Sequence, residues 1–484
     1  MEAEGLQLAE EVNKLMINFI CDGHHPFSLV EKPAFKELLL TLNPQYKVIS
    51  TSTLKARIEV AANQMKKNLR SHLRKVSYVA TTTDCWTAHQ QSFIGVTAHW
   101  IDEETLERRS AALACKRLKG SQTFDVLADA LYDIHCEYGI REKVVRTTTD
   151  SGSNFIKAFK EFGEQSQSED SESDSSEPED NGLELPPHQR CACHLLNLVT
   201  TTDAAKAKTN HTYKLLSHAA FGKCQAMWNK SGRSYIAAET IRKKCKRKLI
   251  RPKKNQWNST YMAVERIIQI IQETGEDAIG GVCQELEVKM LSPAEIAFLT
   301  EYCTVMKPLV KALNILQSEK KTYLGSLLPA IFKLQAELKI QEKSSKMCRP
   351  LITAIQNGVQ KRFGGMMKDP ELIAAAILLP KFKTTWTESA DTIKAGLCYV
   401  RQELDQTEEA NAELNSYLES VYTMNSFPQI KNLSLKLNTG LPASAACERL
   451  FSTAALLFTS KRARMNSTDF ENQLLLKRNK EFRE

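Results

Sequence analysis

The sequence predicts an α/β core joined to a large all-helical region, with further helices at both ends of the chain. Strand-forming residues dominate positions 76–149, where β-branched and alternating runs surround one amphipathic stretch. From position 204 to about 425, nearly every segment instead repeats its apolar residues at helical spacing. The chain has 484 residues, which is enough for two or three domains.

The N-terminal region, residues 1–75, predicts three helices. Positions 6–20 and 34–42 place their apolar residues on one side of a helix, and positions 53–73 surround an apolar stripe with lysines and arginines. Such a basic face can contact a nucleic-acid backbone, although a solvated face is the default explanation.

The core, residues 76–200, begins with a strand over positions 76–84. Strands at 92–101 and 109–118 follow, then a helix at 124–138 and a fourth strand leading to position 149. Short connections between the first three strands predict an antiparallel meander. A right-handed crossover through the helix would then place the fourth strand beside the first.

The tetrapeptide Thr-Thr-Thr-Asp occurs twice in this core and ends at Asp84 and at Asp150. Each aspartate stands where a strand ends, so pairing of the two strands would bring the carboxylates together. A divalent cation would relieve their repulsion, as in the metal sites that serve phosphoryl transfer. An aspartate after a strand is also an ordinary turn or N-cap residue. Both explanations stay open on spacing alone.

Two segments follow the strands. Residues 163–183 are acidic and lack large apolar side chains, which predicts a disordered insertion. Next come His188, Cys191, Cys193 and His194, which have zinc-ligand chemistry but no second ligand couple at a fixed separation. A strand entering a helix at Leu195 is the interpretation that we favour.

The helical region, residues 201–430, contains the densest basic run of the chain, followed closely by an aromatic residue. Positive charge releases counterions from phosphates, and an aromatic ring can stack on an unpaired base. A nuclear localisation signal and a core tryptophan are the alternatives. The residues concerned are Arg242, Lys243, Lys244, Lys246, Arg247, Lys248, Lys253, Lys254 and Trp257.

The C-terminal region, residues 431–484, opens with an apolar helix at 443–458 that contains Glu448 and Arg449. Glu448 could simply form an ion pair with Arg449 or Arg462, or it could be a third carboxylate beside the two aspartates. A closing helix from Ser467 carries a capping-box pattern in its first turn.

Composition bounds the class of protein. Hydrophobic content of 42% and charged content of 25% are typical of a soluble globular protein, and a formal charge of +8 permits a nucleic-acid partner. Thirteen cysteines without C-x-x-C pairs predict reduced thiols. We expect no secretory signal and no membrane partner, because no apolar run reaches the ~20 residues of a membrane span.

Six motifs occur in the order found in one family, and on them the chain resembles the hAT-superfamily transposases. The resemblance is closer to the domesticated hAT-derived proteins of the BED-finger group. The motifs are Pro26-Phe-Ser-Leu-Val-Glu31, Thr82-Thr-Asp84-x-Trp86, Thr149-Asp150-x-x-x-Asn154, Arg190-Cys191-x-x-His194, Trp257-Asn-Ser-Thr-Tyr261 and Ala443-Ser444-x-x-x-x-Glu448-Arg449-x-Phe451.

The resemblance implies an RNase H-like core interrupted by an all-α insertion, with a C-terminal dimerisation region. It implies that Asp84, Asp150 and Glu448 form a catalytic triad that holds Mg²⁺ or Mn²⁺. It assigns Trp257 to base stacking, and Cys191 and His194 to a structural motif. The implied partners are DNA and further copies of the chain, as a homodimer or higher homo-oligomer, in the nucleus. Neither zinc nor a small-molecule cofactor is expected.

The sequence also departs from the family pattern. Gln256 stands where the family has arginine, and no finger with two cysteines and two histidines precedes Pro26. We therefore expect a nuclear, dimerising, DNA-binding protein that regulates transcription or chromatin. An active cut-and-paste DNA transposase that uses two divalent metals is the alternative.

Overall fold

The computed structural model describes residues 2–163, 183–233, 235–253, 257–404, 407–420 and 424–483. Almost all of the acidic insertion and Lys254 lie outside these ranges. The chain forms two compact units. The sheet unit comprises Met1–Cys191, Ser318–Leu324 and Asn432–Glu484, and the helical unit comprises Ala192–Gln317 and Gly325–Lys431.

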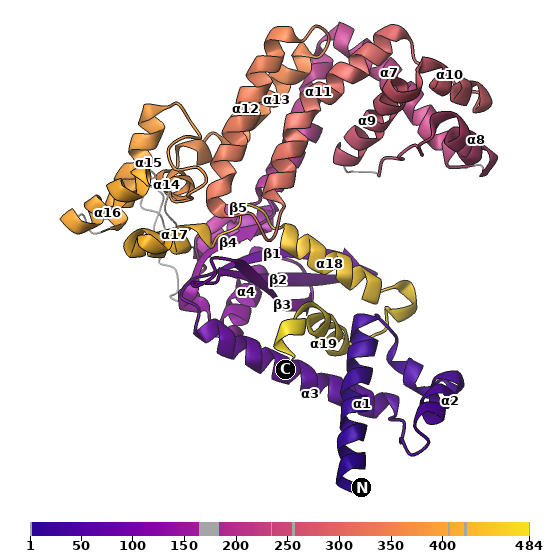
Figure 1. Ribbon diagram of the computed structural model, residues 1–484, viewed down its shortest axis with the longest axis vertical. Helices are drawn as coiled ribbons and strands as arrows, with labels where there is room; N and C mark the ends of the chain where they lie inside the picture. The colour runs from indigo at the N-terminus through magenta and orange to yellow at the C-terminus, as the bar shows by residue number, and fades with distance from the viewer. Residues whose placement is uncertain are drawn as a thin grey trace. The chain divides into compact units, whose positions relative to one another are not determined.

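The sheet unit is built on a mixed five-stranded sheet with the order β3-β2-β1-β4-β5 (Figure 1). The strands are β1 (Val79–Ala88), β2 (Gln91–Ile101), β3 (Arg108–Leu118), β4 (Val144–Thr149) and β5 (His188–Arg190). β1, β2 and β3 form an antiparallel meander, whereas β4 pairs in parallel with both β1 and β5. The expected crossover through α4 (Phe124–Tyr138) is thus confirmed.

The threonine runs at the centre of the sheet are buried and bonded to one another. Thr81 Oγ1 lies 2.7 Å from Thr147 Oγ1 on the neighbouring strand, and Thr82 Oγ1 lies 2.7 Å from Thr97 Oγ1. These hydroxyls satisfy their hydrogen-bonding capacity within the sheet, which is why polar residues are tolerated there. Thr81 also contacts His135 of α4, and Thr82 contacts Cys447 of α18 (Ala445–Leu457). Since successive strand residues point to opposite faces, α4 and α18 cover opposite faces of the sheet.

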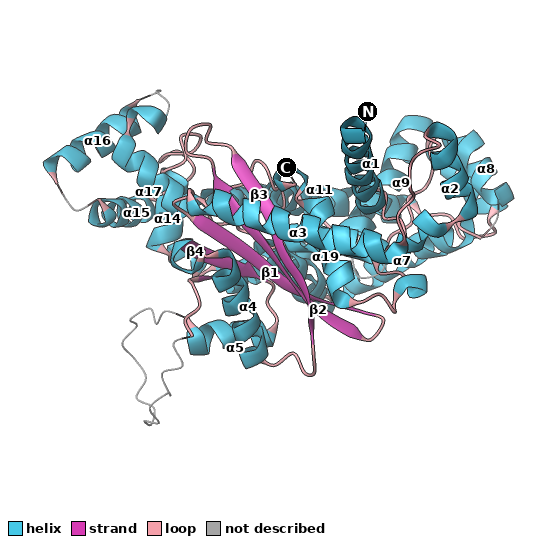
Figure 2. Cartoon of the chain, turned by 90° about the horizontal axis from the view of Figure 1, so that it is seen from below, coloured by secondary structure: helices cyan, strands magenta, loops and turns pink. Residues whose placement is uncertain are grey.

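Further helices complete this unit. They are α1 (Glu2–Asp22), α2 (Pro33–Leu42), α3 (Thr51–Arg74), α5 (Ser153–Phe162), which lies beside α4 (Figure 2), and α19 (Ser467–Arg478). The three expected N-terminal helices are therefore confirmed. None of the described helices is long and apolar enough to cross a lipid bilayer.

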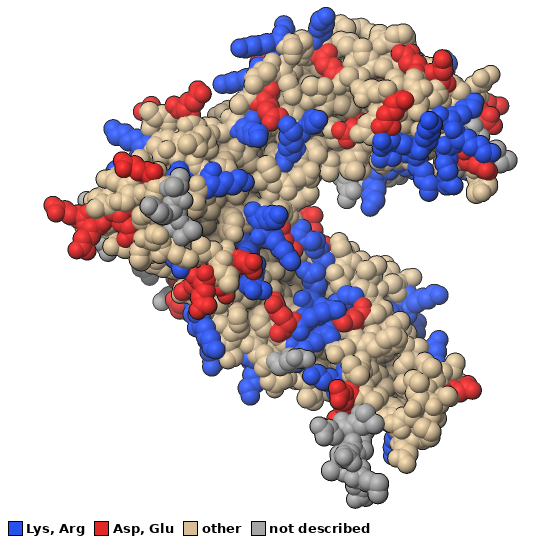
Figure 3. All heavy atoms as spheres, in the orientation of Figure 1, with Lys and Arg blue, Asp and Glu red and all other residues tan. Residues whose placement is uncertain are grey.

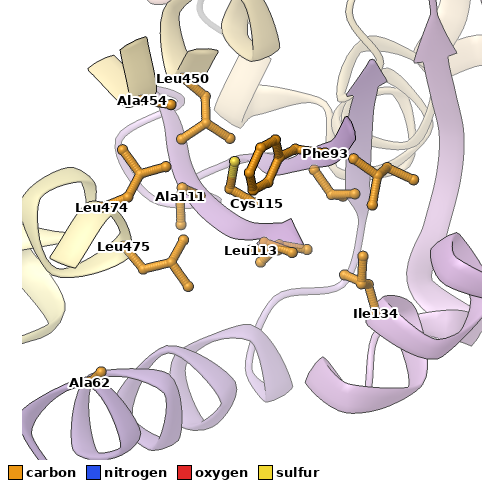
Figure 4. Packing of buried hydrophobic residues seen from close by; sticks show 14 of the residues in the cluster. Ala62, Phe93, Ala111, Leu113, Cys115, Ile134, Leu450, Ala454, Leu474 and Leu475 are labelled. Carbon is orange, nitrogen blue, oxygen red and sulfur yellow. The ribbon is translucent and has the colours of Figure 1, made fainter. Parts of the chain in front are cut away.

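Part of the apolar core of the sheet unit lies where α18 and α19 meet the sheet. Figure 4 shows Leu450, Leu474 and Leu475 gathered around Ala111 of β3, while Ile134 of α4 lies apart from them. Rings at the end of α18 and within α19 also reach β2, since the Phe93 ring lies 5.3 Å from that of Phe458 and 5.2 Å from that of Phe470. Burial of such side chains contributes about 1.5–3 kcal/mol each, so these C-terminal helices are part of the core.

The edge strand β3 is covered by side chains from the C-terminal helical segment. Asn479 accepts a hydrogen bond from the Ala112 amide at 2.8 Å and donates to the Ala112 carbonyl at 2.7 Å. Glu471 accepts from the Cys115 amide at 2.9 Å. The expected capping box is therefore wrong, because Asn466 is the N-cap of α19 and Glu471 serves the strand. Covering an edge in this way prevents its pairing with another strand.

The helical unit has helical secondary structure throughout its assigned elements. A buried ion pair between Arg362 and Asp203, which is 2% exposed, and a capping box joining Ser292 to Glu295 help to fix its helices. The helices are α6 (Ala192–Leu198), α7 (His211–Ser231), α8 (Tyr235–Cys245), α9 (Trp257–Thr274), α10 (Glu276–Glu285), α11 (Pro293–Leu316), α12 (Leu327–Ser344), α13 (Arg349–Phe363), α14 (Pro370–Ile377), α15 (Ala390–Glu403) and α16 (Glu408–Glu419), and α17 (Pro428–Asn438) leads back into the sheet unit.

Candidate functional site

Asp84 and Asp150 lie at matching positions on neighbouring strands. The parallel register pairs Thr83 with Thr149, so each aspartate directly follows the last residue paired between β1 and β4. Asp150 stands at the end of β4 as expected, but the expectation that Asp84 ends its strand is wrong, because β1 continues to Ala88 along its pairing with β2. Asp84 Oδ1 accepts from the Cys85 amide at 2.7 Å, and Asp150 Oδ1 accepts from the Gly152 amide at 2.9 Å. Asp150 therefore makes the turn contact expected of an aspartate after a strand, and it also lies close enough to Asp84 to act on it electrostatically.

Glu448 lies in the first turn of α18, and its side chain is exposed. Two contacts place this helix against the strands. Cys447 Sγ donates to the Thr82 carbonyl at 3.1 Å, and the Phe451 ring lies so close to Gly95 that a Cβ there would be 2.6 Å from it. Gly95 pairs with Asp84 across the β1–β2 ladder, so both contacts lie beside the aspartate.

The pKa of the Asp84 carboxyl is raised from 3.8 to about 7. Burial is the largest cause, because a buried carboxylate loses hydration, and the negative charge of Asp150 is the second. The charge of Glu448 acts in the same direction. The other two acidic residues predicted from the sequence, Asp150 and Glu448, therefore lie within electrostatic range of Asp84.

Carboxylates are the ligands that Mg²⁺ and Mn²⁺ prefer, so the chemistry of this donor set suits a divalent cation. Within the described ranges, however, no three His, Cys, Asp or Glu side chains lie close enough together to hold a metal ion. Carboxylates that repel one another are expected to stay apart until a cation neutralises them. The donor set is thus suited to a cation without being preassembled around one.

The segment before α18 is held by buried polar contacts. The buried Arg108 guanidinium donates to the carbonyls of Asn438 at 2.6 Å and Thr439 at 2.7 Å, and burial lowers the pKa of Arg108 to about 10. Thr148 Oγ1 donates to the Leu441 carbonyl at 2.7 Å, and the Ser444 amide donates to Cys191 Sγ at 3.4 Å. The predicted motif cysteine therefore contacts the segment that leads into α18.

The segment Ser318–Leu324 anchors α18 from another direction. Glu319 forms an ion pair with Arg449 at 2.9 Å and accepts from Ser110 Oγ at 3.1 Å. The Tyr323 ring lies under the Arg108 guanidinium, 5.1 Å from it. Sequence reasoning missed these residues. The only available signal was that a buried arginine requires acceptors, and its acceptors lie more than 300 positions away along the chain.

In the helical unit, the predicted basic run forms the last turn of α8 and the chain after it, and all its described side chains are exposed. Figure 3 shows lysine and arginine side chains gathered in this part of the unit. Arg247 makes two 2.7 Å hydrogen bonds with Glu273, and Lys244 donates to the Gly281 carbonyl at 3.1 Å. Lys243 lies 3.4 Å from Glu239. These three cations are thus partly neutralised or tied to the fold.

The remaining cations of the run make no ion pair with any other described residue. They are Arg242, Lys246, Lys248 and Lys253. Trp257, the first residue of α9, is 9% exposed, so it belongs largely to the core of the helical unit. This agrees with the alternative of a core tryptophan. It also lines an open pocket of about 680 Å³, together with Gln225, Asn229, Arg251, Lys253 and Tyr302.

Known proteins resemble this chain. Residues 82–176 match the family model described as the ZBED1 RNase-like domain. The putative AC transposase of Zea mays is 31% identical over 178 residues, which cover 36% of this chain and 21% of that protein. The chain is a relative of the hAT transposases and BED-finger proteins. The expected resemblance is thus confirmed.

Two further relatives carry different names. Zinc finger BED domain-containing protein 4 of Homo sapiens is 20% identical over 463 residues, covering 93% of this hAT-related chain and 36% of that protein. Putative transcriptional regulator tpeD of Talaromyces stipitatus is 26% identical over 192 residues, covering 38% of the chain and 21% of that protein. The chain spans well under half the length of these three relatives.

Proposed function

We propose that this chain is a nuclear, hAT-transposase-derived DNA-binding protein that regulates transcription or chromatin. The observation that carries the proposal is the exposed cationic segment after α8, which leads to a pocket lined by Trp257 in a chain that also contains an RNase-like domain. The relatives include transposases, a BED-finger protein and a putative regulator, which supports the DNA-binding class. The comparisons do not favour the alternative of an active transposase.

The salt dependence of DNA binding tests the cationic segment. Each phosphate that a cation neutralises adds about 0.9 to the slope of log K against log salt. Replacing Arg242, Lys246 and Lys248 together by glutamine should therefore make the slope for duplex DNA shallower by about 3. The matched control is Arg247→Gln, because Arg247 is already paired with Glu273. Equal slopes for the triple variant and the wild type would refute DNA binding by this surface. The measurement uses purified protein, so effects on nuclear import do not enter.

We also propose that Asp84, Asp150 and Glu448 hold Mg²⁺ or Mn²⁺. The mutual repulsion that contributes to the raised pKa of Asp84 supports this, because a cation would relieve it. A bound ion would supply positive charge next to a phosphate. The chain's own contribution is to hold two carboxylates at matching positions of neighbouring strands and to fix α18 through Cys447 and Phe451.

Mn²⁺ titration followed by electron paramagnetic resonance tests this site. The wild type should bind the ion, and Asp150→Asn should weaken binding at least tenfold. Asp102→Asn is the control, because Asp102 lies in the β2–β3 turn, where it accepts from the Thr105 amide at 2.8 Å. Identical Mn²⁺ affinity in the wild type and the Asp150 variant would rule out the assigned ligands.

Self-association through residues 441–482 is the remaining part of the proposal. Most apolar side chains of α18 and α19 are buried in the sheet unit, but Leu456 is 63% exposed. Leu456→Glu should shift a dimer toward monomer in analytical ultracentrifugation, since a buried charge without a partner is costly at an interface. The same sedimentation coefficient for the variant and the wild type would argue against this face.

A further inference from the structure

A groove lies between α11 and α12, which run antiparallel and side by side in the helical unit (Figure 1). Its volume is about 300 Å³, and its floor is formed by the buried residues Pro308, Ala312, Ala330 and Leu334. The two alanines come from different helices, with Ala312 on α11 and Ala330 on α12. A leucine at either position would extend into the space between the helices. The small side chains therefore keep the groove open.

Pro308 and the contacts around it fix the spacing of the two helices. A proline has no N–H group, so the Thr304 carbonyl one turn earlier lacks its helical donor. Gln341 of α12 takes that place, since its Nε2 donates to this carbonyl at 3.0 Å. Beside the floor, Lys311 and Glu337 join the helices through an ion pair at 3.2 Å. The groove is thus formed in advance, which lowers the cost of binding a ligand.

Exposed isoleucines extend the apolar surface at both ends of the groove. Ile315 lines the groove and is 42% exposed, and Ile340, one turn beyond Glu337 on α12, is 69% exposed. Positions 330 and 340 of α12 are separated by ~15 Å, which is about three turns of a helix. A partner helix that carries apolar residues at every third or fourth position presents a stripe of this length. The apolar surface therefore matches one face of a short helix.

The rim of the groove is positively charged. Lys333 lines the groove, and Lys307 lies one turn before Lys311 on the same face of α11. Both Lys307 and Lys333 are exposed, and neither forms an ion pair with another residue that the structure describes. Among the described residues that line the groove, only Glu337 is acidic, and it is paired with Lys311. Acidic side chains that flank the apolar stripe of a ligand would therefore be attracted.

We propose that this groove docks an amphipathic helix of a partner protein, which places leucine-sized side chains on the floor and acidic side chains against Lys307 and Lys333. Nucleic-acid phosphates would also attract the two lysines, but a sugar-phosphate backbone offers no apolar side chains to the floor.

The groove is separate from the proposed DNA-binding surface. Tyr302 and Met306 of α11 line the pocket beside Trp257. At about 100° per residue, the groove residues of α11 lie on the opposite side of this helix from Tyr302 and Met306. The inference therefore adds a protein partner to the proposed regulatory function and does not depend on DNA binding.

Fluorescence anisotropy with the full chain tests the docking. The probe is a labelled model helix of about 16 residues, longer than the groove, with leucines at every third or fourth position and glutamates beside them. Lys307→Glu with Lys333→Glu should weaken binding at least tenfold. A second peptide, with lysine in place of each glutamate, should bind this double variant at least tenfold more tightly than it binds the wild type. The matched control is Lys339→Glu, an exposed lysine on the far side of α12, which should keep the wild-type affinity.

Each contrary result overturns the proposal. The first is a wild type that does not bind the glutamate peptide, and the second is a double variant that binds it as tightly as the wild type does. The third is equal binding of a peptide with serine in place of leucine, because the floor would then contribute nothing. An equal loss of affinity for duplex DNA in the double variant would assign the face to nucleic acid instead. The substituted lysines are all exposed, so the variants are expected to fold.

Discussion

Replacing Asp84 by asparagine should stabilise the sheet unit at neutral and alkaline pH. Burial, followed by the charge of Asp150 and then that of Glu448, raises the pKa of Asp84 from 3.8 to about 7. A carboxyl with a raised folded-state pKa favours folding only while it is protonated. The penalty is therefore absent below pH 3.8, grows as the pH rises toward 7 and is constant above that. The full shift corresponds to about 4 kcal/mol at about 1.4 kcal/mol per pKa unit.

Hydrogen exchange at the β1 amides of the full chain, in metal-free buffer, measures the stability of the sheet unit alone. Asp84→Asn should slow exchange at pH 8, which corresponds to a gain in the free energy of opening that approaches about 4 kcal/mol. This gain should vanish near pH 4. Asp102→Asn provides a control of opposite sign, because hydrogen bonds from Thr105 lower the pKa of Asp102. A variant at Asp84 that is less stable than the wild type at pH 8, or a gain independent of pH, would refute this reasoning.

Three further changes test other parts of the fold by chemical unfolding. Gly95→Ala should lower the free energy of unfolding by about 1–3 kcal/mol, because the added Cβ would meet the Phe451 ring. The control Gly280→Ala, at an open position of α10, should not destabilise the protein. Arg362→Met should lower the free energy of unfolding by about 3–5 kcal/mol, because it leaves Asp203 buried and unpaired. The control Lys311→Met, which removes an exposed ion pair, should lower it by under about 1 kcal/mol. Burial lowers the pKa of His135 from 6.5 to about 3, so its contribution to stability should fall as the pH drops from 6.5 toward 3. His135→Gln should therefore lose less stability than the wild type over this range, and an unchanged pH profile would contradict this.

The order of the strands could be predicted because short connections and one helical crossover leave few topologies. The same argument placed Asp84 beside Asp150, since the two threonine runs pair in register. Arg108 and Glu319 could not be predicted in their roles. Their partners lie hundreds of residues away or in another region of the chain, and no local pattern encodes such contacts. Periodicity specifies which face of an element is buried, but not which distant loop reaches it.

The candidate site shows the same limit at the level of side chains. The apolar run around Glu448 predicted a buried helix, which placed the residue on the correct element. Whether three carboxylates close around an ion depends on their charge state and on the ion itself. Likewise, the sequence does not distinguish the cations of the basic run from one another. In the structure Arg247 is neutralised by its ion pair with Glu273, whereas the neighbouring Lys248 is not. Charge counts alone therefore overstate the cations available to DNA.

The late position of α18 and α19 has a consequence for how the protein is made on the ribosome. The last strand ends at Arg190, but α18 begins only at Ala445. At ~5–20 residues per second, the nascent strands wait on the order of 10–50 s for the helices that cover one face of their sheet. During that time Phe93 and its apolar neighbours have no partners from these helices. Folding during synthesis is therefore expected to depend on chaperones that shield this face until translation ends.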